Sequence, residues 1–477
     1  MTADASGQIV DASFLPEGFE APCPVAFDHR PLGEDLVLRQ VQCTPELLEA
    51  VMHYVRDAGR EVLNALTVDD MIESLDGAAA EWLAQEAPDE GAVIDAMAVV
   101  TGFSREMVRE SVRIEQESSR PDDMRNALVN EFGDPAVLER FVERPGSRAR
   151  VRAFGPELCF CFLPGNIPGL SHLPFMRSLL VKSPLVCKTS STEPVYAAAY
   201  ARTLARLRPE LGRCFAVLHW RGGTEDVEEV VFRNAGAIIA FGTTQTCEDI
   251  ARRARPDTRL VLHPHKLGFA IIGRGAASTG DLSGLARRLA YDVAMFDQQA
   301  CLSPHWIFVE GESPEAQRVA RALVEALRAM ETALPKGRPP AEEAVAFSRA
   351  WDEAEVAAAM GDPVEVVSLR GKDRFLVIVD MRPLTPSCLG RAIRVVPFPT
   401  FQDLQARLAP YRAYFQNAAL EIEEPRRTEC ATWLGRMGAS RICQPGRMPT
   451  PTMMWHHDGA PCLESLVHYC DLEHAQD

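Results

Sequence analysis

Short apolar runs alternate with amphipathic segments through the middle of the chain, from about residue 150 to residue 262. Each run has the length of a single strand, and the segments between the runs carry apolar residues at helical spacing. The predicted strands are Leu158–Leu163, Leu185–Lys188, Cys214–Trp220, Ala237–Phe241 and Leu260–Leu262, and the predicted helices are Gly169–Val181, Pro194–Leu207, Glu225–Asn234 and Thr244–Ala254. Such alternation indicates a parallel sheet with crossover helices, covered on both faces. We therefore predict an α/β fold with a doubly wound, Rossmann-like nucleotide-binding core, whose ligand lies at the carboxyl ends of the strands.

The flanking regions differ in pattern. Helical spacing dominates residues 45–142, after a Pro- and Gly-rich start with one candidate strand at Leu36–Leu38. Strands and helices alternate again after His263, and the last thirty residues are Pro- and His-rich and then read as helical. We predict a first domain over residues 1–262, an α/β catalytic domain over 263–445, and a tail over 446–477 that packs back on the first domain or on a partner subunit.

Composition narrows the function classes. The chain has 477 residues, 47% of them hydrophobic, and a net charge of −17. An acidic chain repels phosphates, so we expect neither nucleic acid nor an anionic membrane surface as a partner. No apolar stretch is long enough to span a bilayer, and the residues after Met1 lack the pattern of a secretory signal, so we expect a cytoplasmic protein. Thirteen cysteines without a framework spacing are then expected as reduced thiols.

Cys301 is the strongest candidate for a reactive group. It lies in the segment Phe296–Pro304, between a predicted helix and a predicted strand, where a scaffold often presents reactive side chains. A thiol is a natural nucleophile toward a thioester. The alternative is a buried structural cysteine. That role is expected for Cys159 and Cys161, because residues two apart on a strand point to the same face and both can pack in the core.

Other polar residues gather where predicted strands end. Asn166 follows the first strand of the core and could donate an amide N–H to a developing oxyanion, or simply cap the next helix. Lys188 ends the second strand and could hold a ribose or phosphate. Gly242, Thr243 and Thr244 open a helix, whose free N–H groups attract phosphate, although a plain helix cap is equally consistent with them.

The His456–Gly459 segment suggests a metal site at first sight. Adjacent histidines on an extended segment point to opposite faces, so His456 and His457 cannot easily share an ion. No further Cys or His follows at ligand spacing. We therefore predict no metal.

Taken together, these motifs resemble those of the aldehyde dehydrogenase superfamily, in which an Asn loop, a Lys, a Gly-Ser/Thr helix start and a nucleophilic Cys follow in this order. Within it, the chain is most similar to acyl-CoA reductases of the bacterial-bioluminescence fatty-acid reductase type. The segments that carry the resemblance are Pro164–Gly169, Phe241–Thr244, Asp297–His305, Gly438–Met448 and Trp455–Gly459. The resemblance implies a covalent acyl thioester on Cys301, an oxyanion held by Asn166 and the Cys301 N–H, and release of an aldehyde after reduction by NAD(P)H.

Two departures from ordinary aldehyde dehydrogenases refine this expectation. Those enzymes carry a water-activating Glu four residues before a Lys; alignment on Lys266 puts Leu262 there, and residues 258–280 contain no Asp or Glu. We therefore expect Leu262 to face the nucleophile with no carboxylate nearby, which favours reduction over hydrolysis. The Glu that normally holds the nicotinamide ribose is also missing from residues 383–402, where Ser387 falls nearest.

The resemblance also implies partners and a cofactor preference. Where NAD-specific relatives carry an acidic residue, three positions after the Lys, this chain has Ser191, so we expect NADPH with NADH as the alternative. We expect an acyl-CoA or other acyl thioester as substrate, an acyl-protein synthetase as a partner, and a homo-oligomer. The remaining alternatives are a hydrolytic aldehyde dehydrogenase, a reductase of short, aromatic or carrier-bound acyl groups, and a non-catalytic acyl- or nucleotide-binding protein.

Overall fold

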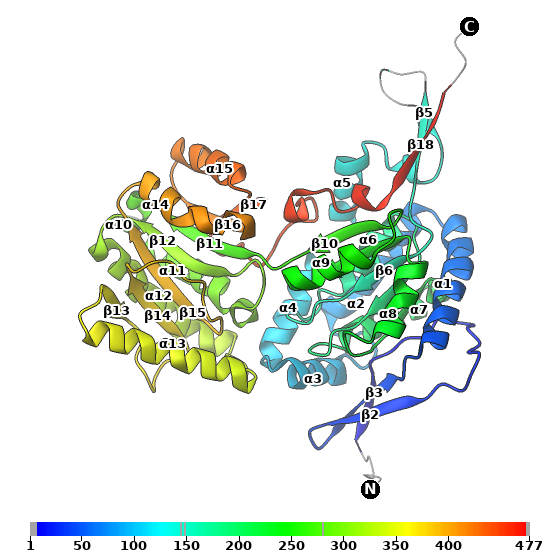
Figure 1. Cartoon of the computed structure of the whole chain (residues 1–477), viewed down its shortest axis with the longest axis horizontal. Helices are drawn as coiled ribbons and strands as arrows, with labels where there is room; N and C mark the ends of the chain where they lie inside the picture. Colours follow the sequence, from blue (N-terminus) through cyan, green and yellow to red (C-terminus); the bar gives the residue numbers. More distant parts are fainter. Residues whose placement is uncertain (1–6, 144–145, 147–148, 279–280, 474–477) are drawn as a thin grey trace.

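The computed structural model describes residues 7–143, 146, 149–278 and 281–473, and it consists of two lobes joined side by side (Figure 1). The first lobe holds the N-terminal region and the core of the first predicted domain, and the second lobe is built around residues 267–443. Among the described residues, no helix is both long and apolar enough to cross a membrane.

The N-terminal region is a small sheet followed by helices that cover the first lobe. The sheet consists of β1 (Gln8–Asp11), β2 (Phe27–Leu32) and β3 (Leu36–Val41), and the helices are α1 (Pro45–Ala65), α2 (Val68–Ala84), α3 (Glu90–Thr101), α4 (Arg105–Glu117) and α5 (Pro121–Phe132). Thr44 begins α1 by accepting a hydrogen bond from the Leu47 N–H, as an N-cap residue does. Apolar residues of α1, such as Val51 and Val55, pack in one cluster with Phe160 of the first large sheet.

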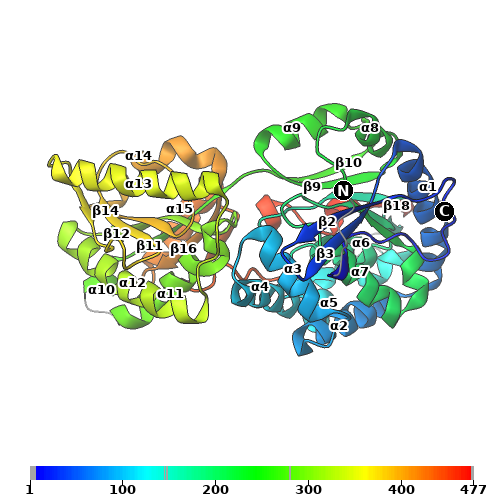
Figure 2. The same ribbon diagram turned by 90° about the horizontal axis from the view of Figure 1, so that it is seen from below.

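The first large sheet is parallel throughout, as predicted. Among the described residues its strand order is β10-β9-β6-β7-β8. Its strands are β6 (Cys159–Phe162), β7 (Leu185–Lys188), β8 (Phe215–Leu218), β9 (Ala237–Phe241) and β10 (Arg259–His263), and its helices are α6 (His172–Leu180), α7 (Tyr196–Leu207), α8 (Glu225–Asn234) and α9 (Thr244–Arg253). Figure 2 shows α8 and α9 on one face and α6 and α7 on the other. Cys159 and Cys161 are fully buried on one face, consistent with a structural role.

The second lobe contains a larger mixed sheet, with the order β13-β14-β15-β12-β11-β16-β17 among the described residues. Its strands are β11 (Leu267–Ile272), β12 (Pro304–Glu310), β13 (Val364–Val366), β14 (Leu376–Asp380), β15 (Ala392–Phe398), β16 (Phe415–Glu421) and β17 (Arg441–Cys443), and its helices are α10 (Arg274–Ser278), α11 (Leu282–Ala294), α12 (Ser313–Ala333), α13 (Ala341–Ala359), α14 (Phe401–Leu408) and α15 (Arg426–Arg436). Strand β16 is buried and pairs with β11, but it was not predicted from the sequence pattern.

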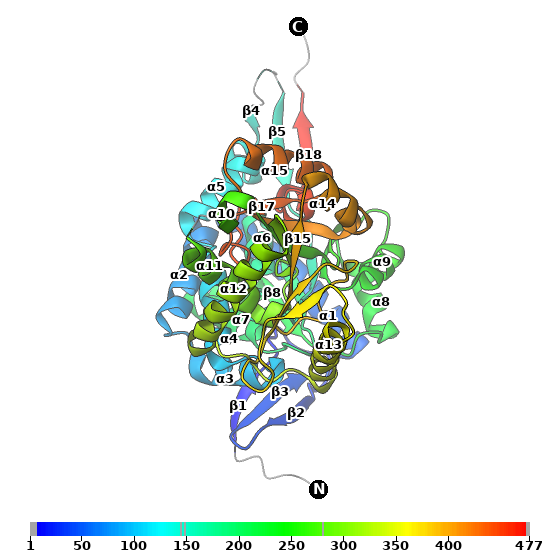
Figure 3. The same cartoon turned by 90° about the vertical axis from the view of Figure 1, so that its left-hand side faces the viewer.

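The C-terminal tail returns to the first lobe, but its end is not helical as predicted. Strand β18 (His468–Leu472) pairs antiparallel with β5 (Arg150–Phe154), which also pairs with β4 (Val142–Glu143). This small sheet projects from the body, at the end opposite to β1–β3 (Figure 3). The Glu131 carboxylate fixes the tail just before β18 by accepting hydrogen bonds from the N–H groups of Cys462, Leu463 and Glu464. Pairing with β5 decides the outcome, because a local pattern does not show which strand edge a segment will meet.

Candidate active site

The backbone that leads to Cys301 is held in an unusual conformation. Phe296, Asp297 and Gln298 all have positive φ values, of 56°, 46° and 71°. Non-glycine residues rarely adopt this region, and each costs of the order of 1–3 kcal/mol unless its surroundings impose it. Strain of this kind clusters at functional sites, so the conformation itself singles out the Cys301 loop.

A buried ion pair imposes this conformation. The Asp297 carboxylate accepts hydrogen bonds from Nε of Arg391, at 2.7 Å, and from the Gly337 N–H, at 3.0 Å. Arg391 is fully buried, and its guanidinium also donates to Glu331 at 2.6 Å. The Asp297 carbonyl accepts the Gly390 N–H at 2.9 Å. The loop is thereby fastened to segments far away in the sequence.

The far side of the loop rests directly on β11 and β16. A Cβ atom on Gly268 would come within 2.7 Å of the Ser303 carbonyl oxygen and 2.8 Å of that of Leu302, so a larger residue does not fit there. Asn417 donates its side-chain amide to the Leu302 carbonyl at 3.1 Å. These contacts place Cys301 above the edge where the strands of the second sheet begin.

Cys301 itself is partly exposed and lines an apolar pocket. The pocket has a volume of ≈ 70 Å³, and its apolar side chains include Ile167, Leu170, Leu173, Met176, Phe296, Leu302, Met453 and Trp455. Burial of the sulfur and the charge of Asp458 raise the pKa of the Cys301 thiol to about 12, while hydrogen bonds from the loop backbone and from the Gln416 amide act in the opposite direction. The thiol therefore needs a proton acceptor before it can attack at neutral pH.

Asn166 lies against the Cys301 loop. Its side-chain amide donates to the Gln299 carbonyl at 2.9 Å, which leaves the second N–H of that amide for another acceptor. The alternative role as a helix cap does not apply, because the N-cap residue of α6 is Ser171. Asn166 thus contacts the Cys301 loop at Gln299, two residues before the predicted nucleophile.

Two of the predicted cofactor residues line a separate groove in the first lobe. Lys188 and Ser191 line this groove, whose volume is ≈ 700 Å³, together with Gly222, Gly223, Phe241, Thr246, Arg252 and Arg253. Burial lowers the pKa of Lys188, and the charge of Glu228 partly offsets that effect. Arg253, which the sequence analysis did not single out, bonds Glu228 at 2.6 Å. The groove is thus lined by acidic as well as basic side chains, and two of its arginines are paired: Arg253 with Glu228 and Arg252 with Asp249.

The helix start Gly242-Thr243-Thr244 is exposed at the carboxyl end of β9, beside this groove. Thr243 is the N-cap residue of α9, and its hydroxyl accepts a hydrogen bond from the Thr246 N–H at 3.1 Å. The cap uses one N–H, and the other N–H groups of the first turn remain available to a phosphate. Capping and anion binding are thus compatible here.

Glu193 and Ser387, the polar side chains nearest to two expected cofactor contacts, hydrogen-bond to the protein's own backbone. Glu193 is buried and accepts hydrogen bonds from the N–H groups of Val195 and Tyr196, so its carboxylate faces the start of α7. Ser387, which falls nearest to the missing ribose-binding Glu, donates its hydroxyl to the Ala392 carbonyl within its own loop.

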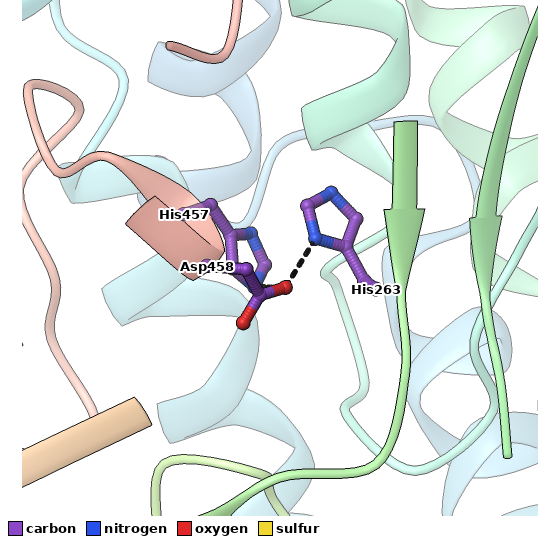
Figure 4. Close-up of side chains that lie close together, drawn as sticks. All are labelled: His263, His457 and Asp458. Carbon is purple, nitrogen blue, oxygen red and sulfur yellow. Dashed lines mark hydrogen bonds and ion pairs between the residues drawn. The ribbon is translucent and has the colours of Figure 1, made fainter. Parts of the chain in front are cut away.

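The expectation that Leu262 faces Cys301, with no carboxylate nearby, is wrong. Leu262 packs against the apolar cluster on the other face of the first sheet. Two carboxylates bear on the site: Glu115 lines the Cys301 pocket, and the charge of Asp458, which belongs to the tail, acts on Cys301. Asp458 accepts a hydrogen bond from His263 Nδ1 at 2.8 Å (Figure 4). It also accepts one from Gln416 Nε2 at 2.6 Å.

His263, His457 and Asp458 also form a group that could hold a metal ion, with ligand atoms within 4.8 Å of one another. His456 is exposed and lies outside this group, as expected for adjacent histidines, whereas His263 was not predicted as a neighbour. The Arg177 guanidinium lies at 3.3 Å from His263 Nε2 and 3.4 Å from His457 Nδ1. Because the positively charged Arg177 guanidinium already contacts these two nitrogens, it repels a metal ion bound to the same histidines. The absence of a metal therefore stays our prediction.

Three of the residues that the sequence did not reveal are polar side chains that tertiary contacts bury. Gln416 and Asn417 stand in an otherwise apolar strand, and Arg177 is 5% exposed in an apolar helix. A polar residue inside an apolar run is itself a signal, because its burial requires a partner. That signal marks Gln416 and Arg177 as candidates without identifying what they contact.

Comparisons with known proteins place this geometry in context. A family model described as acyl-CoA reductase (LuxC) matches residues 63–469. The long-chain acyl-protein thioester reductase of Photorhabdus luminescens is 26% identical over 420 residues, which cover 86% of this chain and 83% of that protein. Aldehyde dehydrogenase 21 of Physcomitrella patens matches with a TM-score of 0.73 at 15% identity, over 98% of both chains. NADP-dependent glyceraldehyde-3-phosphate dehydrogenase of Bacillus halodurans C-125, solved with NADP, matches with a TM-score of 0.70 at 13% identity, over 94% of this chain and 95% of that one. The aldehyde-dehydrogenase-like α/β fold predicted from the sequence is confirmed.

Proposed function

Because this chain belongs to the acyl-CoA reductase (LuxC) family, we propose that it reduces a fatty acyl thioester to the aldehyde through a covalent thioester on Cys301. The observation that carries the proposal is the apolar pocket that ends at Cys301. An apolar wall with a nucleophile at its end suits an acyl chain whose carbonyl is presented to the sulfur.

The residues of the site account for the acyl transfer. The Cys301 sulfur attacks the carbonyl carbon, and the carbon–sulfur bond to the leaving thiol breaks. The negative charge that develops on the carbonyl oxygen is stabilised by the Asn166 amide and the Cys301 N–H, the roles that the family resemblance implies. The Asn166 N–H that the Gln299 carbonyl does not occupy is available for this purpose. After hydride addition, the carbon–sulfur bond to Cys301 breaks and the aldehyde leaves.

A nicotinamide cofactor fits the groove of the first lobe, and it would supply the hydride. Lys188 and Ser191 would hold the adenosine ribose, and the N–H groups around Gly242, Thr243 and Thr244 would hold the pyrophosphate. We propose NADPH at least as readily as NADH. Ser191 is neutral and can donate a hydrogen bond to a phosphate, and Glu193 is turned into the protein and so does not repel a 2′-phosphate.

The donor, assembly and location complete the proposal. The Photorhabdus luminescens relative is described as acting on an acyl-protein thioester, so we propose that a partner synthetase can deliver the acyl group in place of coenzyme A. We also propose a homo-oligomer, because the sheet of β18, β5 and β4 projects from the body (Figure 1). The side chain of Leu472 on β18 is exposed there. The chain's free cysteines suit the reducing cytoplasm.

Mass spectrometry of the intact protein tests the central claim. After mixing with acyl-CoA of graded chain length and no cofactor, the mass of the protein should rise by that of one acyl group, and NADPH should then release the aldehyde. The Cys301→Ala variant should lose reduction by several orders of magnitude while its melting temperature stays unchanged. An acyl adduct on Cys301→Ala would refute the assignment.

The pocket volume favours a second candidate, a short-chain acyl reductase. A pocket of ≈ 70 Å³ accepts only the carbonyl end of a long chain unless side chains move. Met176 and Met453 line it, and flexible methionines readily move aside for a longer chain. The graded chain lengths decide the question: fastest acylation by long chains supports the fatty acyl substrate, and fastest acylation by two- to four-carbon chains supports the alternative.

Asp458 favours a third candidate, a hydrolytic aldehyde dehydrogenase, because a carboxylate near Cys301 could activate water. Incubation of aldehyde with NADP⁺ and no coenzyme A separates the two. A reductase should form free acid far more slowly than it reduces acyl-CoA, whereas comparable rates would support the hydrolytic enzyme.

A further inference from the structure

A buried lysine lies in the connection between α12 and α13. Lys336 is 8% exposed, and its ammonium donates hydrogen bonds to the carbonyl oxygens of Gly390, at 2.7 Å, and Arg374, at 2.8 Å. The Phe347 ring faces the same nitrogen, which lies 3.7 Å from the ring centroid. Burial of a charged group is costly without such partners. The two carbonyls and the ring therefore explain why an ammonium is tolerated inside the second lobe.

Gly390 connects Lys336 to the Cys301 loop. Its carbonyl accepts from Lys336, and its N–H donates to the Asp297 carbonyl at 2.9 Å. The φ values of Leu389, Gly390 and Arg391 are 69°, 63° and 63°, so a second left-handed segment lies against the one in the Cys301 loop. Leu389 and Arg391 adopt this conformation at a cost, as non-glycine residues do, so contacts such as that of Lys336 must impose it.

Helix α13 provides a second connection. Glu343 lies one turn before Phe347 on this helix, and its carboxylate accepts a hydrogen bond from the Gln299 side chain at 3.0 Å. The Gln299 carbonyl accepts the Asn166 amide at 2.9 Å. Lys336 thus contacts both the second left-handed segment and the first turns of α13, and each of them holds the loop that carries the nucleophile.

Lys336 remains charged at neutral pH in spite of its burial. Burial lowers the pKa of Lys336 to about 8, and the charge of Asp297 acts in the opposite direction. A charged donor binds a carbonyl more strongly than a neutral donor does. Loss of the ammonium would deprive the carbonyls of Gly390 and Arg374 of this donor and allow the second left-handed segment to relax.

We propose that Lys336 is a positioning residue: by holding Gly390 and the start of α13, it aligns the Cys301 loop with the Asn166 amide for attack of the sulfur on the acyl carbonyl. The inference rests on the proposed function. In this role Lys336 acts through Gly390 and Gln299 and does not touch the substrate. The alternative is a lysine that only stabilises the fold, and the two roles differ in which reactions of Cys301 they affect.

Single-turnover acylation tests the proposal. With acyl-CoA in excess and no cofactor, mass spectrometry follows the acyl adduct on Cys301 over time. The rate constant describes the folded molecules, whereas the final extent reports how many molecules are folded. Lys336→Met should lower the saturating rate constant about tenfold, because a small displacement of the loop misaligns sulfur and carbonyl, and should leave half-saturation by acyl-CoA unchanged. Lys372→Met, at an exposed position, is the matched control and should behave as the wild type.

Alkylation distinguishes lost alignment from general damage. Iodoacetamide alkylates a thiolate by displacement and forms no oxyanion, so the reaction does not need the Asn166 amide. Alkylation of Cys301 in Lys336→Met should stay within about twofold of the wild type, as judged by peptide mapping against the exposed Cys470. An unchanged acylation rate constant, or equal losses of acylation and alkylation, would overturn the proposal.

The sharpest test combines Lys336→Met with Asn166→Ala. If Lys336 aligns the loop with the Asn166 amide, most of its effect should vanish once that amide is absent. Adding Lys336→Met to Asn166→Ala should then slow acylation less than about threefold. A further loss of about tenfold would show that the two side chains act independently, and the proposal would be wrong.

Phe347→Leu is the milder variant in case Lys336→Met does not fold. It keeps the lysine and removes only the ring contact, so it should slow acylation about threefold and leave alkylation unchanged. Acylation at the wild-type rate in this variant would contradict the proposal. Failure of every acyl thioester to acylate the wild type would refute the proposed function itself, a different result from any of these.

Discussion

The cofactor groove and the Cys301 pocket are two halves of one proposed active site, yet they are built in opposite ways. The groove is formed by residues 162–253, a continuous part of the first lobe, and its polar side chains come from strand ends and from α8 and α9. The Cys301 pocket takes residues from α4, the Asn166 loop, α6, the Cys301 loop and the tail. The groove is wide and polar, whereas the pocket is small and apolar.

The difference affects how each region should respond to substitution. In the groove, the side chains are positioned by nearby strand ends and helices and are joined mainly by exposed or partly exposed ion pairs, so a change at one position should disturb few others. At Cys301, the loop is held by Asp297, Arg391, Gly268 and Asn417, so a change in one should disturb the others. Paired substitutions, one in each region, test this contrast.

The largest effect is expected from Arg391→Met. Removing one partner of a buried ion pair leaves Asp297 without its partner and should lower the free energy of unfolding by about 3–5 kcal/mol. The exposed pair of Arg252 and Asp249 beside the groove is the control, and Arg252→Met should cost less than about 1 kcal/mol. Urea unfolding measures both, and equal losses would contradict the contrast.

Asn166→Ala should lower turnover by about a hundredfold, the usual loss for one oxyanion donor. Substrate binding should change little, because the oxyanion develops mainly in the transition state. Asn166→Asp is the matched control: it keeps the shape but replaces the donor with an acceptor, so it should be impaired at least as strongly. Steady-state kinetics give the answer, and a raised KM with an unchanged kcat would mean that Asn166 only shapes the pocket.

Ser191→Glu should shift the cofactor preference about tenfold toward NADH, since a carboxylate repels a 2′-phosphate and accepts from a ribose hydroxyl. The stability of the protein should not change, because Ser191 is exposed. The ratio of kcat/KM for NADPH and NADH measures the shift. A wild type that strictly requires NADH would contradict the proposed preference.

The smallest effect concerns Glu115, which lines the Cys301 pocket. Burial raises the pKa of Glu115 to about 8, although Arg177 acts against this. The folded state therefore binds this proton more tightly than the unfolded state, and its contribution to stability is lost as the pH rises through about 8. Glu115→Gln should reduce the fall in stability between pH 5 and pH 8.5. The fall should persist in part, because burial also raises the pKa of Asp292 to about 7.

Glu225→Gln is the counterpart in the groove. Glu225 is exposed there, so its replacement should leave the pH dependence of stability as in the wild type. Urea midpoints at the two pH values compare the variants. Identical slopes for Glu115→Gln and the wild type would show that Glu115 is ionised alike in the folded and unfolded states.

The sequence alone determined the parallel core, the groove and the candidates Cys301, Asn166 and Lys188. All of these follow from short-range patterns: strand–helix alternation, polar residues at strand ends, and motifs within a few residues of each other. Predicted and observed boundaries agree for β7, β9 and α8, where apolar runs and helical spacing are unambiguous.

Only the tertiary structure decided what surrounds Cys301. Asp458 contacts His263, which is 195 residues away along the chain, and Gln416, which is 42 residues away. The side chain expected to face Cys301, Leu262, instead points into the opposite face of its sheet. The tail forms β18 rather than a helix because β5 offers it an edge. Contacts between distant segments depend on how whole elements pack, and no local pattern of polar and apolar residues contains that information.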